Sequence, residues 1–287
     1  MTTIAQIRPL PPGLHFVATP IGTARDITLR ALDVLASADV IAAEDTRTTR
    51  HLMDLHGVVL GERRLIAYHD HNGAVVRPGL LAMMAEGKSV AYASDAGTPL
   101  VADPGFALAR DALAAGLLVT GAPGPSAVTA ALMIAGLPTD RFLFAGFLPP
   151  TQSARRKVLT ELGKTPATLV YFESAKRLLP TLRDIGATLG EERLVAVCRE
   201  LTKRFEEVRR GMAGELAAHY QAVPAKGEVV LLIDRSRALA SVEDMRAALR
   251  DAMAHESLKD AARTVSDALG LARRDVYQAA LAMEKDR

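Results

Sequence analysis

Short apolar runs that alternate with helical stretches constrain the fold of this chain more than any other feature. In the first half, strand-like runs occupy residues 14–19, 40–43, 65–68, 90–93 and 117–120. Helical spacing of apolar residues occurs at 27–36, where Asp26 or Thr28 is a candidate N-cap, and at 106–115 and 126–135. Short buried strands separated by helices are typical of an α/β domain with a mainly parallel sheet.

The second half repeats this apolar rhythm after a composition change at Leu137-Pro138. Strand-like runs lie at 142–147, 169–172, 194–198 and 229–233, while residues 205–212 alternate and predict an antiparallel strand. From about residue 241 the chain is helical and charged, with a helix, a glycine-containing turn and a helix over 257–277. We therefore expect a flexible lead-in (1–13), an N-terminal α/β domain (14–138), a second α/β domain (139–236) and a helix-turn-helix-like segment (241–287).

Composition excludes several classes of protein. The single cysteine, Cys198, rules out an intramolecular disulfide and a cysteine-rich zinc site, and it suits a reducing cytosol. No export signal and no apolar run of about 18 residues is present, so we expect a cytoplasmic protein without a membrane segment. The net charge of +2 permits an acidic partner without requiring one.

Four polar loops follow four of the predicted strands of the first half. They read Thr-Pro-Ile-Gly at 19–22, Glu-Asp-Thr-Arg at 44–47, Ser-Asp-Ala-Gly-Thr-Pro at 94–99 and Gly-Ala-Pro-Gly-Pro-Ser at 121–126. Each alone is ordinary turn chemistry. Ligands of α/β sheets bind beyond the carboxyl ends of the strands, so four such loops at one edge favour a binding site.

The usual nucleotide and hydrolase motifs are absent from the sequence. No G-x-G-x-x-G follows the first strand, and neither H-E-x-x-H nor G-x-S-x-G occurs. Gly163-Lys164-Thr165 matches the end of a P-loop, but Val158 stands where that motif requires glycine. The sequence therefore does not support an interpretation as a dinucleotide-binding, ATP-binding or hydrolytic protein.

Several long motifs in a fixed order carry a family resemblance. They are "ATPIGTARDITLRALDVL", "IAAEDTRTTRHL", "YHDHN", "SDAGTPLVADPG", "PGPSAVTAALMIAGLPTDRFLFAGFLP", "YFESAKRLLPTL", "CRELTKRFEEVRRG" and "GEVVLLI". Together, over about residues 14–280, they resemble the ribosomal small subunit methyltransferase I family, whose fold is similar to that of the tetrapyrrole methylases. The resemblance implies two α/β domains with a cofactor cleft between them, a small C-terminal helical segment, and a homodimer.

The resemblance also implies the reaction. S-adenosylmethionine would donate a methyl group to the 2′-hydroxyl of a cytidine ribose in the decoding region of small-subunit (16S) ribosomal RNA. Two alternatives stay open: a methylase of a tetrapyrrole or other small molecule, and a non-catalytic nucleic-acid-binding regulator that uses the C-terminal helices. By resemblance, "AEDTR" and "SDAGTP" argue against the first, and the large α/β body with its converging loops argues against the second.

The cofactor-binding prediction combines residue chemistry with the resemblance. Gly97 allows a close approach of the backbone, Phe172 offers a ring for adenine, and the helix that begins near Ser126 favours a carboxylate. The full predicted set is Pro20, Asp95, Gly97, Thr98, Ser126, Ala127, Phe172, Thr202 (or Leu201) and Gly227.

Catalysis of an in-line methyl transfer depends mainly on positioning, and a base helps to remove the hydroxyl proton. Candidate bases are Asp45, His69, Asp103, Glu173 and Glu200, and spacing alone selects none of them. We take Asp45, Arg47 and Glu173 as the catalytic candidates, with Arg47 suited to hold an RNA phosphate. The His69-Asp70-His71 run is read as solvated turn residues, and no metal is expected.

Basic residues concentrate in the second half of the chain. A solvated helical face explains any one cluster, but their number favours contact with RNA phosphates for some of them. The predicted RNA-binding residues are Arg155, Arg156, Lys157, Lys203 and Arg204.

Overall fold

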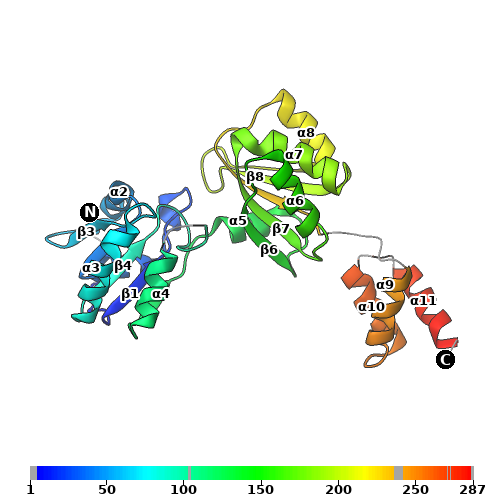
Figure 1. The fold of residues 1–287 in the computed structure, drawn as a ribbon, viewed down its shortest axis with the longest axis horizontal. Helices are drawn as coiled ribbons and strands as arrows, with labels where there is room; N and C mark the ends of the chain where they lie inside the picture. Colours follow the sequence, from blue (N-terminus) through cyan, green and yellow to red (C-terminus); the bar gives the residue numbers. More distant parts are fainter. Residues whose placement is uncertain (1–4, 103–104, 236–241, 270, 272, 286–287) are drawn as a thin grey trace.

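The computed structural model describes residues 5–102, 105–235, 242–269, 271 and 273–285. Within these ranges the chain forms two five-stranded sheets, each with its own helices, and a C-terminal group of helices (Figure 1). The candidate base Asp103 and the turn residue Gly270 lie outside the described residues.

The first sheet is wholly parallel, as the sequence predicts. Its strands are β1 (Gly13–Val17), β2 (Val40–Ala43), β3 (Arg64–Ala67), β4 (Ser89–Ala93) and β5 (Val119–Ala122), in the order β3-β2-β4-β1-β5. All five residues of β4 are buried, because helices cover both faces of the sheet. Strand β5 begins two residues later than the apolar run at 117–120 suggests.

Helices cover both faces of the first sheet. They are α1 (Leu29–Ser37), α2 (Thr46–Leu55), α3 (Gly73–Ala85) and α4 (Phe106–Ala114), with a short 3-10 turn η1 (Ala24–Asp26) before α1. Helices α1 and α2 pack on one face, around Leu35 and Ile41, and α3 and α4 pack on the other, around Leu80 and Tyr92. Helices α2 and α3 were not predicted from the sequence.

Helix α1 begins where its N-cap residue is satisfied. The Thr28 hydroxyl accepts a hydrogen bond from the Ala31 N–H at 3.1 Å, while the other candidate, Asp26, lies in η1. Replacing Thr28 by alanine is expected to lower the free energy of unfolding by about 1 kcal/mol, because the Ala31 N–H loses its partner. Urea denaturation measures this, with Thr28→Ser as the matched control that keeps the hydroxyl. Equal midpoints for Thr28→Ala and the wild type would contradict the capping role.

The second sheet is mixed, in the order β6-β7-β10-β8-β9. Its strands are β6 (Phe142–Phe147), β7 (Thr168–Ser174), β8 (Leu194–Arg199), β9 (Glu207–Met212) and β10 (Glu228–Ile233). Strands β6 and β7 are parallel and the remaining neighbours are antiparallel. The antiparallel β9 confirms the prediction from its alternating sequence.

Helices also cover both faces of the second sheet. Helices α6 (Gln152–Leu162), α7 (Ala175–Leu189) and α8 (Ala213–Ala222) share one core with the sheet, and α5 (Ala127–Ala135) packs on the opposite face. Helix α5 lies within the range 14–138 that the sequence analysis gave to the first domain, yet Ala131 and Leu132 pack against Val170 and Val230 of the second sheet. Because α1 to α4 already cover the first sheet, the apolar side of α5 is buried on the second.

The C-terminal helices are α9 (Val242–Ala252), α10 (Leu258–Leu269) and α11 (Arg273–Lys285). Their small core includes Leu249, Val265 and Val276, and all of its members come from these helices and the residues between them. Helices α10 and α11 occupy the two stretches that the sequence predicts on either side of a turn. No helix in the described part of the chain has the length and apolar character needed to cross a membrane.

Candidate active site

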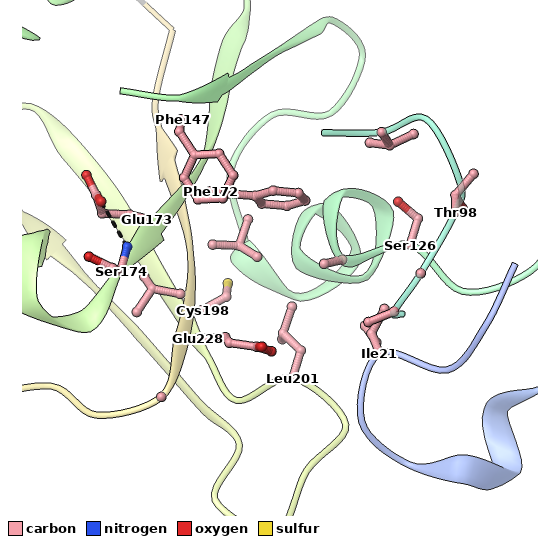
Figure 2. Close-up of a pocket in the computed structure, with 17 residues that line it drawn as sticks. Ile21, Thr98, Ser126, Phe147, Phe172, Glu173, Ser174, Cys198, Leu201 and Glu228 are labelled. Carbon is pink, nitrogen blue, oxygen red and sulfur yellow. Dashed lines mark hydrogen bonds between the residues drawn. The ribbon is translucent and has the colours of Figure 1, made fainter. Parts of the chain in front are cut away.

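A cavity of about 360 Å³ lies between the carboxyl edge of the first sheet and the α5 side of the second (Figure 2). The first sheet contributes residues of its strand-end loops, and the second contributes strand ends and the turns beside them. The lining residues are Ile21, Ala96, Gly97, Thr98, Val101, Ser126, Ala127, Phe147, Phe172, Glu173, Ser174, Cys198, Leu201, Gly227, Glu228, Val229 and Val230. A largely apolar cavity of this size with a few polar groups is typical of a small-molecule site.

The strand-end loops of the first sheet converge as the sequence predicts. Thr19 and Gly97 exchange two backbone hydrogen bonds of 2.9 and 3.0 Å, which join the loops after β1 and β4. The Thr98 hydroxyl donates to the Pro125 carbonyl at 2.9 Å, which joins the loops after β4 and β5. Three of the four loops line the cavity, because these bonds hold them at one edge of the sheet.

The fourth loop, residues 44–47, supports the cavity from outside. The Asp45 N–H donates to Asp95 Oδ1 at 2.9 Å, so the Asp95 carboxylate joins this loop to the lining segment. The side chain of Asp45 caps α2 and binds the Arg47 guanidinium at 2.5 Å. Hydrogen bonds from the side chain and backbone of Arg47 lower the pKa of Asp45 to about 2. Such a carboxylate is a weak base at neutral pH, and neither Asp45 nor Arg47 lines the cavity.

Glu173 lies in the cavity wall, but its carboxylate is bonded within the second domain. Its Oε1 accepts from the Ser174 N–H at 2.8 Å (Figure 2), and its Oε2 accepts from the Thr181 hydroxyl at 2.8 Å. Arg177 forms an ion pair with it at 3.1 Å. The buried carboxylate therefore anchors the first turns of α7 beside the cavity.

A tight loop after β8 connects the two halves of the site. The backbone at Glu200 and Thr202 has positive φ angles of +52° and +61°. The Thr23 N–H donates to Thr202 Oγ1 at 3.1 Å, and the Thr23 hydroxyl donates to the Thr202 carbonyl. The Glu200 carboxylate accepts a hydrogen bond from the Glu228 N–H at 2.9 Å. This bond is the main cause of the lowered pKa of Glu200, and the bond from Lys203 lowers the pKa further. The base candidate Glu200 is thus a support of the cavity rim.

The predicted cofactor set divides into residues that line the cavity and residues next to it. Gly97, Thr98, Ser126, Ala127, Phe172 and Gly227 line it. Pro20, Asp95 and Thr202 do not, but each directly adjoins a lining residue: Ile21, Ala96 and Leu201. Phe147, Cys198 and Glu228 were not predicted for the site. Phe147 and Cys198 end predicted strands but Glu228 precedes one, so strand ends alone would not have selected all three.

Comparison with known proteins identifies the family. A family model described as Tetrapyrrole (Corrin/Porphyrin) Methylases matches residues 13–217, and one described as the RsmI C-terminal HTH domain matches residues 240–284. Ribosomal RNA small subunit methyltransferase I of Mesorhizobium japonicum is 51% identical over 81% of this chain and 79% of its own length. The protein of that name from Escherichia coli O157:H7 is 44% identical over 93% of this chain and 94% of its own length. This chain belongs to the ribosomal RNA small subunit methyltransferase I family. That membership confirms the expected enzyme class, a methyltransferase with S-adenosylmethionine as methyl donor.

Solved structures confirm the predicted fold of the methyltransferase. The methyltransferase CobJ matches with a TM-score of 0.59 at 20% identity, covering 78% of this chain and 95% of its own. Diphthine synthase also matches at 0.59, with 16% identity over 77% of this chain and 89% of its own. At sequence identities of 20% and 16%, this structural similarity supports the two-sheet fold.

The basic residues predicted to bind RNA have different surroundings in the methyltransferase. Arg155 is buried, and its guanidinium contacts the Asp184 carboxylate at 2.6 Å, so it is not accessible to an RNA phosphate. Arg156 contacts the same carboxylate at 2.7 Å but stays half exposed. Lys203 binds two carboxylates of the cavity rim, at 2.8 and 3.1 Å. Lys157 and Arg204 are exposed.

One further base candidate lies away from the cavity. His69 follows β3, and its backbone N–H donates to Asn72 Oδ1 at 2.9 Å within a turn. It does not line the cavity of the methyltransferase, so its position favours a role in the turn.

Proposed function

We propose that this chain transfers a methyl group from S-adenosylmethionine to the 2′-oxygen of a cytidine ribose in the decoding region of 16S ribosomal RNA. The curated relatives over most of its length bear the name ribosomal RNA small subunit methyltransferase I. The observation that carries the proposal is the cavity between the two sheets, lined by three loops of the parallel sheet. We further propose a cytoplasmic homodimer, supported by exposed large apolar side chains such as Phe106 and Met133.

The residues of the cavity fit S-adenosylmethionine. Phe172, which packs against Phe144 at a centroid distance of 4.8 Å, provides an aromatic wall for the adenine. The first turn of α5 at Ser126 and Ala127 presents backbone N–H groups, which favour the methionine carboxylate. When bound, the cofactor supplies an electrophilic methyl group on a sulfonium.

The chain's own contribution to the reaction is positioning. The ribose 2′-oxygen must lie in line with the methyl carbon and its bond to sulfur, so rigidity of the surrounding loops favours the reaction. We propose that Asp45, Arg47 and Glu173 act as positioning residues. Asp45 is bonded to Asp95 and Glu173 to Thr181, while Arg47 holds the side chain of Asp45. Asp95, Pro20 and Thr202 would hold the lining residues beside them.

The proposal is tested by transfer of labelled methyl from S-adenosylmethionine to purified small ribosomal subunits that lack the modification. Nuclease digestion then maps the labelled nucleotide. We expect label on a 2′-O-methylcytidine in the decoding region. Cofactor binding without transfer to the subunit would favour a small-molecule acceptor, and failure of both would overturn the assignment of the cavity.

A further inference from the structure

A bulge in strand β6 changes the face on which Phe147 lies. Phe144 pairs with Val170, but Phe147 pairs with Phe172, so β6 has one residue more than β7 between these pairs. Gly146 lies in this interval with a φ of +66°. Without the extra residue, alternation would place Phe147 on the face opposite to Phe144. The bulge instead brings both rings to the cavity face.

The segment after the bulge is fixed by two arginines. Arg177 donates to the carbonyls of residues 148 and 149, and Arg155 donates to those of residues 149 and 150. Each guanidinium is also paired with a buried carboxylate, Glu173 or Asp184. These bonds fix the backbone that directly follows Phe147.

The Phe147 ring is at the same time exposed. It lines the cavity, yet 57% of its surface is open to solvent. It meets Phe172 edge to face, with ring centroids 5.7 Å apart (Figure 2). Phe172 is the more buried of the two rings, which suits its proposed contact with the adenine of S-adenosylmethionine. What distinguishes Phe147 from other exposed phenylalanines such as Phe106 and Phe205 is that its ring lines the cavity, where an entering ligand meets it.

The chemistry of the proposed RNA acceptor indicates which group can stack on the Phe147 ring. For the ribose 2′-oxygen to come within bonding distance of a methyl carbon inside the cavity, its nucleotide must enter the cavity mouth. A nucleotide that leaves the stacked strand to do so exposes a base that lacks its stacking partners. An aromatic side chain replaces such a partner for any base. Lys176, exposed two residues beyond the lining residue Ser174, adds positive charge near the same strand end.

We propose that Phe147 is the stacking platform for the nucleobase of the methylated nucleotide, forming an acceptor subsite beside the donor cavity. This inference rests on the proposed function, since it requires an RNA acceptor. Phe147 is then a binding residue for the substrate, and its effect is on the acceptor rather than on the donor.

Steady-state methyl transfer to small ribosomal subunits tests this with Phe147→Ala, Phe147→Leu and Phe147→Tyr. We expect Phe147→Ala to raise KM for the subunit about ten-fold or more, because one base–aromatic stack is lost. Phe147→Leu keeps an apolar side chain without a π-face and should behave like Phe147→Ala, whereas Phe147→Tyr should retain the wild-type KM. Affinity for S-adenosylhomocysteine, measured by calorimetry, should be unchanged in all three.

Phe142→Ala is the matched control, because Phe142 is the exposed phenylalanine at the other end of the same strand. Its KM should equal that of the wild type, and thermal unfolding confirms that every variant is folded. Weakened S-adenosylhomocysteine binding with an unchanged subunit KM would overturn the inference and assign Phe147 to the donor. An unchanged KM for Phe147→Ala would overturn it as well. Absence of methyl transfer by the wild type would instead refute the proposed function.

Discussion

Replacing Asp184 by asparagine is expected to lower the free energy of unfolding by about 3–5 kcal/mol, because it leaves a buried guanidinium without its counter-charge. The Asp184 side chain is fully buried and accepts hydrogen bonds from Arg155 and Arg156, each at 2.7 Å, and from Gln152 at 3.2 Å. Arg155 is itself only 5% exposed, so water cannot replace the lost carboxylate. Urea denaturation followed by circular dichroism measures the change.

Asp54→Asn is the matched control for this prediction. Asp54 forms an ion pair of 3.0 Å with Arg50, one helical turn earlier on α2, and both side chains are about half exposed. Such a surface pair contributes only about 0.3–0.5 kcal/mol. A loss for Asp184→Asn no larger than that of the control would show that the Arg155 pair does not stabilise the domain.

The same pair makes stability depend on pH. Burial raises the pKa of Asp184, but hydrogen bonds from Arg156 and Arg155 outweigh it, so the pKa lies below its ordinary value. A carboxyl with a lowered folded pKa stabilises the protein above its unfolded pKa of about 3.9, and this contribution is lost as the pH falls through the folded pKa. The difference between wild type and Asp184→Asn should therefore be largest near neutral pH and should shrink below about pH 4.

The helical pattern around Arg155 explains why this residue is buried although it belongs to a run of three basic residues predicted to contact RNA. Val158, Leu159 and Leu162 follow Arg155 at three, four and seven positions, which is the spacing of one helix face. Arg155 thus shares the buried stripe of α6, while the side chain of Lys157 is exposed. Reading the charges against the apolar period would have separated the buried arginine from its exposed neighbour.

The fold was predictable where apolar runs and loops carry local signals. The strands of the first sheet and the antiparallel β9 follow from their patterns, because burial of one or both faces dictates which residues are apolar. The sheet on which α5 packs did not follow, because its apolar residues indicate burial but not the surface that provides it. The bulge at Gly146 depends on pairing with β7, which no local pattern of β6 specifies.

The site was predictable on its parallel side. The loops after β1, β4 and β5 were located because the carboxyl ends of parallel strands share one edge. The opposite wall combines Phe147, Cys198 and Glu228 from strands that run in both directions, so no such rule selects the correct ends. Glu228, which follows Gly227 and begins β10, lies beside Ser174 at the carboxyl end of β7 because the two strands are antiparallel.

Replacing that Gly227 by alanine is expected to reduce the affinity for S-adenosylhomocysteine at least ten-fold. The φ angle of Gly227 is +83°, which costs an L-residue about 1–2 kcal/mol. An added Cβ would also overlap Glu200 Oε1, the atom that accepts from the Glu228 N–H and from Lys203. Such charge-assisted hydrogen bonds contribute about 1.5–3 kcal/mol to the stability of the rim. Because ligand binding must then re-form the displaced rim, that cost is subtracted from the binding free energy, and about 1.4 kcal/mol corresponds to a ten-fold change in affinity.

Gly116→Ala separates the overlap with Glu200 from the backbone strain. Gly116 has a similar φ of +71°, nothing lies within 4 Å of its added Cβ, and it precedes β5 at the edge of the first sheet remote from the cavity. This variant should lose stability but bind S-adenosylhomocysteine like the wild type.

A second control, Glu200→Ala, removes the same hydrogen bonds from the cavity rim without changing Gly227. If displacement of Glu200 causes the loss, Gly227→Ala combined with Glu200→Ala should bind about as weakly as Glu200→Ala alone, because a single interaction cannot be lost twice. Additive losses in binding free energy would instead show that Gly227 acts on the cavity independently of Glu200.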